Sequence, residues 1–446
     1  MLQKVESKVE QMTVKITSLD TKNKNFSKIL LDKIRINKSL NSKILNQVTK
    51  IVSDIKKNGD VSLIKYIKKF DGYKPKNMKN IAITNLEIKK AYNFVSKEEI
   101  VNLKKAINRI YKFSRKQLST SWIEKKDNTS LGEKVTPIES VGIYVPGGKA
   151  SYPSTVIMNT IPAKVAGVER IIMTCPMSNI RDHSLAIVAA DLCGVDKIFR
   201  VGGAHAIAAL AYGTKSILKV DKIVGPGNLY VALAKKTVFG DVGIDNIAGP
   251  SEVIIIADSS NNPDWVAIDL FSQAEHDELA QSVMITTSAS FIKAVKNSMS
   301  KLISSLPRKK IILESLNNRG MFIKAKSNNE ICTIVNKIAP EHLEIMCKNN
   351  KSILKSIKNA GAIFLGEFSP EVFGDYCAGP NHVLPTSGSA RFSSPLGVYD
   401  FQKRSSIIEI SKATADQLSK IASSMASAEG LQAHAISASY RRKNKN

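Results

Sequence analysis

The sequence predicts an α/β protein with largely parallel sheets, and three observations support this class. From about residue 140 onward, short runs rich in β-branched residues alternate with segments of helical length. These runs are SVGIYVPGG, RIIMTC, KIFRVGG, KIVGPGN, SEVIIIAD, SVMITTS and GAIFLGEF. Several end in glycine turns that lead into a predicted helix. With 446 residues, of which 43% are hydrophobic, the chain can bury a large core, and roughly two to four domains are expected.

Two helices are predicted before this alternating region. In NSKILNQVTKIVSDIKKNGD, apolar residues recur at helical spacing and Gly59 ends the run. A second helix follows directly, with Asp60 as its expected N-cap. Its apolar face carries Leu63, Ile64, Ile67 and Phe70.

The glycine turns mark a candidate ligand site. They lie at Gly147–Gly148, Gly202–Gly203 and Gly225–Gly227. At the carboxyl ends of parallel strands, backbone amides and helix N-termini can bind anionic groups. None of these turns matches GxGxxG, and ordinary tight turns look the same, so they permit a nucleotide without requiring one.

Composition excludes several classes of protein. No apolar run approaches the roughly 18 residues that cross a bilayer, and the segment MLQKVESKVEQMTVKI has no signal-peptide core. We therefore expect a cytoplasmic protein with no membrane partner. The five cysteines are widely spaced and include no CxxC pair, so neither a disulfide framework nor a thiolate zinc cluster is indicated. We expect these cysteines to act as small buried hydrophobic residues.

The net charge of +26 is unevenly distributed. Residues 1–140 hold 31 Lys and Arg against 14 Asp and Glu, whereas residues 141–300 hold 13 against 14. The basic part alternates lysine with isoleucine and asparagine, and lacks the aromatic residues that stack on single-stranded nucleic acid. A solvated basic face is therefore favoured over a nucleic-acid partner.

The chain contains only six histidines, so each sequence context is informative. In SQAEHDELAQS, Gln273 and His276 are three apart in a helix-like stretch and could hold one metal ion. His382 follows Asp375 closely, and His434 lies five residues after Glu429. A set of oxygen and nitrogen ligands suits zinc or a harder divalent ion. Structural roles for these residues are the alternative.

The stretch IAPEHLEIM places Glu341 beside His342 within apolar sequence. One interpretation is structural, since a helix that begins after Pro340 favours glutamate in its first turn. The other is an acid/base pair shielded from bulk water.

From about residue 30 to 436 the chain resembles the histidinol dehydrogenase family. Long motifs in order carry the resemblance: VGIYVPGGKASYPSTVIMNTIPAKVAGV, VGPGNLYVALAKKTVFGD, AGPSEVIIIAD, SQAEHDELAQS, IAPEHLE, GDYCAGPNHVLPTSGSARFSSPL and VYDFQKR. The resemblance implies an NAD-dependent four-electron oxidation of L-histidinol to L-histidine through L-histidinaldehyde, the last step of histidine biosynthesis. It also implies a homodimer with one zinc ion per subunit.

The resemblance assigns roles to individual residues. It implies zinc ligands at Gln273, His276, Asp375 and His434. Glu341 and His342 match the catalytic acid/base pair, and both are expected to contact substrate together with the zinc ligands. Further substrate-contacting positions are Ser251, His382 and Glu429. Positions that contact NAD are Tyr144, His205 and Asn228. At His205 the family usually has glutamine, so we expect altered NAD affinity with activity retained.

The family's chemistry fits these residue types. Oxidation of an alcohol requires a base for the hydroxyl proton while a hydride leaves the carbon, and imidazole suits that task. The aldehyde must then be hydrated, and Glu341 is the neighbouring carboxylate that could activate water. An ion that binds the imidazole nitrogen and the amino group of histidinol would fix the reacting carbon.

The resemblance also implies an architecture. It comprises two nucleotide-fold-like, incomplete Rossmann-like domains with small terminal segments in a domain-swapped homodimer. We expect residues 26–138 with 252–390 to form the first domain, which carries the zinc and catalytic residues. Residues 139–251 are expected to form an inserted NAD-binding domain, and residues 1–25 with 391–446 the dimerisation segments. The terminal segment with Glu429 and His434 is expected to reach into the partner's active site.

Three alternatives stay open at this point. A relative in the same family could oxidise another polar alcohol, such as a sulfonated diol, although such relatives are expected to differ where imidazole and amine are held. A zinc hydrolase would leave the glycine turns without a nucleotide, and HExxH is absent. A nucleic-acid-binding protein would show strongly salt-dependent binding, which the near-neutral middle of the chain disfavours.

Overall fold

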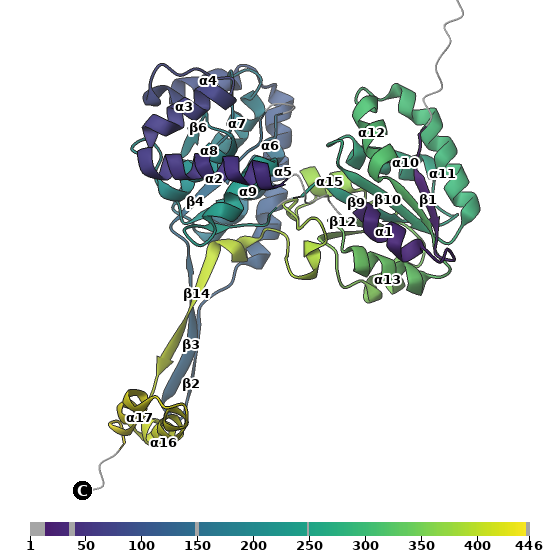
Figure 1. Cartoon of the computed structure of the whole chain (residues 1–446). Coiled ribbons are helices and arrows are strands. Elements are labelled where there is room, and N and C mark those ends of the chain that lie inside the picture. The colour runs from purple at the N-terminus through teal and green to yellow at the C-terminus, as the bar shows by residue number, and fades with distance from the viewer. Residues whose placement is uncertain (1–13, 35–40, 148–150, 248, 443–446) are drawn as a thin grey trace, which may run out of the picture.

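The computed structural model describes residues 14–34, 41–147, 151–247 and 249–442. Two α/β bodies lie side by side, and a narrow arm extends from one of them (Figure 1). The strands are β1 (Thr17–Asp20), β2 (Trp122–Lys126), β3 (Thr129–Pro137), β4 (Ser140–Tyr144), β5 (Arg170–Thr174), β6 (Lys197–Phe199), β7 (Lys222–Val224), β8 (Gly243–Ile244), β9 (Glu252–Ile256), β10 (Gln281–Thr286), β11 (Met321–Lys324), β12 (His342–Ile345), β13 (Ala362–Leu365) and β14 (Gln402–Glu409).

The helices alternate with the strands for most of the chain. They are α1 (Phe26–Ile34), α2 (Asn41–Asn58), α3 (Asp60–Phe70), α4 (Asn85–Tyr92), α5 (Lys97–Ser114), α6 (Pro153–Ala166), α7 (Ser184–Cys193), α8 (Gly203–Tyr212), α9 (Leu229–Val238), α10 (Pro263–Ala274), α11 (Ala289–Leu302), α12 (Lys309–Arg319), α13 (Asn328–Ile338), α14 (Asn350–Ser356), α15 (Glu371–Tyr376), α16 (Lys412–Ala428) and α17 (Gln432–Ser439).

Each body is built on a parallel sheet. One sheet has six strands in the order β1-β11-β10-β9-β12-β13, and the other has five in the order β6-β5-β4-β7-β8. All neighbouring strands in both sheets pair in parallel. Every residue of β4 and β9 is buried, as expected for strands that helices cover on both faces. The predicted α/β class with parallel sheets is confirmed.

The helices α2 to α5 pack on the five-stranded sheet. Val48 and Ile55 of α2 share a core with Leu210 of α8, and Ile110 of α5 shares another with Ile143 of β4. The expected division instead grouped residues 26–138 with 252–390. An apolar stripe shows that a helix covers a sheet but does not specify which sheet, so chain order was a poor guide to this pairing.

The two segments expected to form dimerisation units lie in different parts of the structure, and their role in a dimer stays a prediction. Strand β1 joins the six-stranded sheet beside β11, and residues 1–13 and 443–446 lie outside the described residues. The arm consists of the antiparallel sheet β14-β3-β2 with α16 and α17 at its tip (Figure 1). Large apolar side chains on the arm are exposed: Ile123, Leu131, Ile408, Leu418, Ile421, Met425, Ile436 and Tyr440.

Polar contacts of Arg109 and Asn381 connect the bodies next to α15. Arg109 Nε of α5 donates to the Cys377 carbonyl at 2.7 Å. Asn381 Nδ2 donates to the Met158 carbonyl of α6 at 2.6 Å, and Asn381 is buried. These bonds hold the segment after α15 against the body that contains the five-stranded sheet.

Two local expectations are wrong. Gly59, at φ +52°, is the N-cap of α3, and Asp60 is its first helical residue, whose carboxylate accepts a 2.7 Å bond from the Ser216 hydroxyl. Four cysteines are buried as expected, but Cys377 is exposed. Among the described residues, no helix is long and apolar enough to cross a membrane.

Candidate active site

Glu341 and His342 lie at the start of β12, at the amino ends of the central strands of the six-stranded sheet. The structural interpretation of IAPEHLEIM as a helix start is wrong, because this segment enters a strand. Both side chains are buried. Glu341 Oε2 accepts a 2.9 Å bond from the Glu252 N–H, and His342 Nδ1 lies 3.1 Å from the Glu252 carbonyl. A carbonyl only accepts, so Nδ1 carries the proton and Nε2 of the neutral ring is free to act as a base.

Carboxylates surround the imidazole of His342. Its Nδ1 lies 3.8 Å from oxygens of both Glu341 and Glu371, and its Nε2 lies 3.6 Å from Asp375 Oδ1. Burial opposes protonation, but the carboxylates of Glu371, Glu341 and Asp375 outweigh it and raise the pKa of His342 well above its ordinary value. Burial raises the pKa of Glu341 to about 7, against the opposing effects of His342 and the Glu252 N–H. Glu341 can therefore change its protonation state near neutral pH, whereas the surrounding carboxylates favour the protonated form of His342.

Candidate metal ligands lie beside His342. Nitrogen and oxygen atoms of His276, Glu371 and Asp375 lie within 4.8 Å of one another. Gln273 is fully buried in the last turn of α10, and with its amide nitrogen turned toward Glu371 it donates to both Glu371 oxygens at 3.1 and 3.2 Å. Its carbonyl oxygen is thereby left for another partner. His276 lies just beyond the end of α10 rather than in the helix, and its backbone N–H donates to the backbone carbonyl of Gln273 at 3.3 Å.

The cluster formed by His276, His342, Glu371 and Asp375 has the properties of a cation site. Burial raises the pKa of Glu371 well above its ordinary value, and Asp375, Glu344 and Glu341 add to the shift because they repel its charged form. The buried Nε2 of His342 has no hydrogen-bond partner among the described residues. A divalent cation would relieve the repulsion among these carboxylates, and the nitrogen and oxygen donors suit zinc. The residues therefore fit the metal that the resemblance implies.

The other residues expected to contact substrate lie in different parts of the structure. His382 belongs to the cluster, since its Nδ1 lies 2.8 Å from the Asp375 carbonyl. Ser251 directly precedes Glu252, whose backbone holds the acid/base pair. Glu429 and His434 lie exposed at the tip of the arm, away from both bodies (Figure 1). A single chain does not bring them to the cluster.

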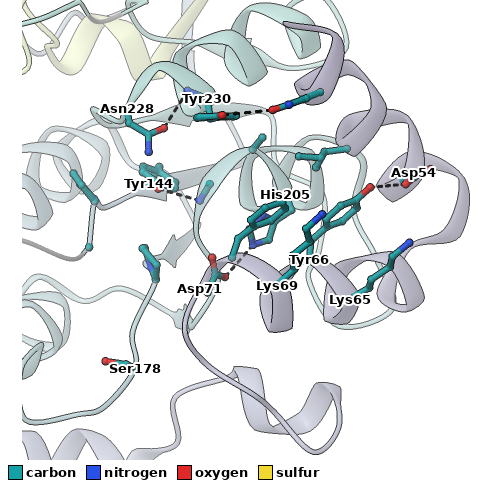
Figure 2. A pocket seen from close by; sticks show the side chains of 18 of the residues that line it. Asp54, Lys65, Tyr66, Lys69, Asp71, Tyr144, Ser178, His205, Asn228 and Tyr230 are labelled. Atoms are coloured by element: carbon teal, nitrogen blue, oxygen red, sulfur yellow. Dashed lines mark hydrogen bonds and ion pairs between the residues drawn. The ribbon is translucent and has the colours of Figure 1, made fainter. Parts of the chain in front are cut away.

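The expected cofactor residues line one cleft of about 1140 Å³ in the other body. Tyr144 ends β4, His205 lies in α8, and Asn228 caps α9 (Figure 2). The Tyr144 hydroxyl accepts a 3.1 Å bond from the Gly203 N–H, and the Asn228 oxygen accepts bonds from Tyr230 and Val231 N–H. Residues of α2 and α3 form another wall of the cleft. The volume exceeds that of most small-ligand pockets, roughly 300–1000 Å³, so an extended dinucleotide fits.

His205 is anchored within this cleft. Its Nε2 donates to Asp71 Oδ2 at 2.9 Å, and both side chains are almost fully buried. The same Asp71 oxygen accepts a 3.0 Å bond from the Gly202 N–H. The ring lies about 6 Å from those of Tyr66 and Phe70. Asp71 thus links the imidazole of His205 to the glycine turn that begins α8.

Sequence reasoning missed several residues of these sites. Glu371, Glu252 and Glu344 are buried near His342, and Asp71 holds the glycine turn at the cleft. Glu371 offered a usable signal, because it precedes Asp375 by one helical turn directly after a proline. Glu344 lies two residues after His342 in the same strand, so the stretch IAPEHLEIM already contained it. Glu252 and Asp71 come from a distant strand and helix end, and nothing in their local sequence marks them.

The fold and its sites define the class of this protein. Parallel α/β sheets, a dinucleotide-sized cleft, and an acid/base pair beside candidate metal ligands are the features of a cofactor-dependent oxidoreductase. The histidinol dehydrogenase family model matches residues 35–442. The chain belongs to the histidinol dehydrogenase family.

Individual relatives agree over most of the chain. It is 52% identical over 395 residues to histidinol dehydrogenase of Dechloromonas aromatica, covering 88% of this chain and 91% of that protein. It is 49% identical over 437 residues to the Cupriavidus pinatubonensis enzyme, covering 97% and 98%. The crystal structure of histidinol dehydrogenase from Elizabethkingia anophelis has a TM-score of 0.89 at 35% identity, covering 96% and 98% of the two chains.

Proposed function

We propose that this protein oxidises L-histidinol to L-histidine through L-histidinaldehyde with NAD, as the last step of histidine biosynthesis. Membership of the histidinol dehydrogenase family supports the reaction. The observation that carries the proposal is the proximity of His342 to Asp375, 3.6 Å, within a cluster that also contains His276. An acid/base group and candidate metal ligands can therefore act on one small substrate.

We infer one zinc ion per subunit, held by Gln273, His276 and Asp375 of one chain and His434 of its partner. Zinc bound there would take the imidazole nitrogen and amino group of L-histidinol as ligands and so orient the substrate. His382 lies beside Asp375, and because Nδ1 makes this contact, Nε2 is the atom proposed to bind the substrate. Ser251 of the chain that carries the cluster and Glu429 of the partner subunit complete the proposed substrate contacts.

In the proposed chemistry, His342 removes the hydroxyl proton as a hydride leaves the same carbon. Its Nδ1–H bond to the Glu252 carbonyl directs Nε2 toward the cluster. Glu341, with its pKa raised to about 7 chiefly by burial, then takes a proton from the water that hydrates the aldehyde. His342 deprotonates the hydrate as the second hydride leaves. NAD supplies the hydride acceptor in both oxidations.

The cleft lined by Tyr144, His205 and Asn228 is the proposed NAD site. The Asn228 oxygen is used by the first turn of α9, which leaves its amide N–H₂ to donate to the cofactor. Because Asp71 fixes the ring of His205, imidazole in place of glutamine is expected to change NAD affinity while activity is retained. The body that contains this cleft is the proposed NAD-binding, incomplete Rossmann-like domain.

We propose that two chains form a domain-swapped homodimer with shared active sites. The arm places Glu429 and His434 far from the cluster of their own chain (Figure 1). Its tip exposes Ile421, Met425 and Ile436, a concentration of apolar surface that favours burial against another protein surface. A swapped arm would cover these residues and deliver His434 to the partner.

The proposed reaction has a distinctive stoichiometry. Purified protein with zinc, NAD and L-histidinol should form about two NADH for each L-histidine, because each oxidation releases one hydride. Absorbance at the NADH band and chromatography of histidine measure the two products together. Treatment with a zinc chelator should stop both. One NADH per product, or conversion of histidinol without NAD reduction, would rule out the proposed function.

A further inference from the structure

The wall of the cofactor cleft formed by α2 and α3 carries a carboxylate in a fixed position. The Tyr66 hydroxyl donates to Asp54 Oδ2 at 2.5 Å, and both residues line the cleft. Tyr66 is buried, and its ring stacks on that of Phe70 at 6.0 Å with an interplanar angle of 5°. Burial raises the pKa of Tyr66 to about 12, and the hydrogen bond to Asp54 adds to the shift, so the phenol remains a donor at neutral pH. The bond occupies one carboxylate oxygen and leaves the other for a ligand.

This wall is the end of the cleft away from the catalytic cluster. Among the other lining residues, Ser151 lies two residues before α6. Asn381, six residues after Asp375 of the cluster, donates to the Met158 carbonyl of that helix at 2.6 Å. Figure 2 shows Asp54 and Tyr66 on the opposite side of the pocket from Ser178. The nicotinamide ring must face the reacting carbon, so the adenosine half of NAD would extend toward α2 and α3.

The charges at this end oppose one another. Lys50, Lys65 and Lys69 also line the cleft, and all three are exposed. These lysines alone would attract a phosphate group, whereas the Asp54 carboxylate would repel one. A carboxylate is instead suited to accept hydrogen bonds from the hydroxyl groups of a ribose. Since Asp54 is half-buried and fixed by Tyr66, solvent screens its charge less than it screens the lysine ammonium groups.

We propose that Asp54, held in place by Tyr66, binds the adenosine ribose hydroxyls and thereby selects NAD over NADP. The inference rests on the proposed function, in which NAD occupies this cleft. A 2′-phosphate in place of the 2′-hydroxyl would remove a hydrogen-bond donor and place a second anion beside Asp54. Without Asp54, the three lysines would make the same end favourable to the phosphate.

The variant Asp54→Asn tests the proposal through cofactor binding in the absence of substrate. Isothermal titration calorimetry should show that wild-type protein binds NAD at least about tenfold more tightly than NADP. In the variant, we expect the Kd for NADP to fall by at least about tenfold and the Kd for NAD to rise by a few fold. The ratio of kcat/KM for the two cofactors should change in the same direction.

The chain offers a matched control in Asp241→Asn. Asp241 accepts a 2.9 Å bond from the Tyr212 hydroxyl and pairs with Lys56 at 3.3 Å, but it does not line the cleft. Its replacement removes a comparable tyrosine-bound carboxylate and should leave both Kd values within about twofold of wild type.

Three outcomes distinguish the proposal from the function on which it rests. If Asp54→Asn keeps the wild-type melting temperature and the NADP Kd stays within about twofold of wild type, the proposal is wrong. Should this variant unfold, Asp54→Ser, which also removes the charge, carries the same expectation and the same contrary result. Failure of wild-type protein to bind NAD at all would instead overturn the proposed function.

Discussion

Replacing His342 with glutamine should lower kcat for L-histidinol oxidation by about 10²- to 10⁴-fold, the usual contribution of a positioned acid/base group. Glutamine has a similar length and can keep a hydrogen bond to the Glu252 carbonyl, which His342 Nδ1 now makes at 3.1 Å. It cannot accept a proton from the substrate at neutral pH. Steady-state NADH formation at saturating L-histidinol and NAD measures the loss.

Binding measurements separate this effect from a loss of structure. In the variant His342→Gln, zinc content by atomic absorption and the Kd for L-histidinol should stay close to wild type, because His342 is not a proposed zinc ligand. Near-normal turnover in His342→Gln would refute the assignment of the base.

The activity of the wild-type protein should rise through about pH 7, because Glu341 becomes the basic carboxylate there. The variant Glu341→Gln should lose this rise.

Replacing His276 with asparagine should lower zinc content and activity together, each by at least about tenfold. His276 lies within 4.8 Å of donor atoms of Glu371 and Asp375. The amide of asparagine is a much weaker zinc ligand than imidazole, and the remaining carboxylates would be left close together without their cation. Metal analysis and NADH formation on the same sample check both effects.

The exposed thiol of Cys377 provides the control for the metal experiment. It lies two residues after Asp375, and a cysteine thiolate is a common zinc ligand in proteins. Cys377→Ser should nevertheless keep one zinc per chain and the wild-type rate. Full activity in a metal-free His276→Asn protein would contradict a role for zinc in this site.

The local elements of the fold could be predicted from the sequence. Apolar spacing predicts α2, the glycine at its end adopts φ +52° as expected for a helix stop, and the run SEVIIIAD contains the fully buried strand β9. The grouping of α2 to α5 with the five-stranded sheet could not be predicted in this way. That grouping depends on contacts between residues far apart in sequence, such as Val48 with Leu210.

The residues of the candidate site also differ in whether local sequence or only long-range packing reveals them. Glu341 and His342 are neighbours in sequence, and their unusual context was visible. The cluster that receives them is assembled from α10, β12 and α15, and Glu371 and Glu252 enter it only through tertiary packing. The resemblance of motifs indicated Gln273, His276 and Asp375 as zinc ligands. The structure places all three beside Glu371, and their role as zinc ligands stays a prediction. Charge patterns alone gave no indication of Asp54 or Asp71, because each is an ordinary acidic residue near a helix end.

The central claim is that one catalytic centre combines the His342 cluster of one chain with the arm of another. Mixing two inactive variants, His342→Gln and His434→Asn, tests it directly. In a mixed dimer, the chain with intact His342 would receive an intact arm from its partner, so one site of two is restored. Random reassortment should therefore recover about a quarter of wild-type NADH formation. If the mixture stays as inactive as its parents while native mass spectrometry shows mixed dimers, the shared centre does not exist.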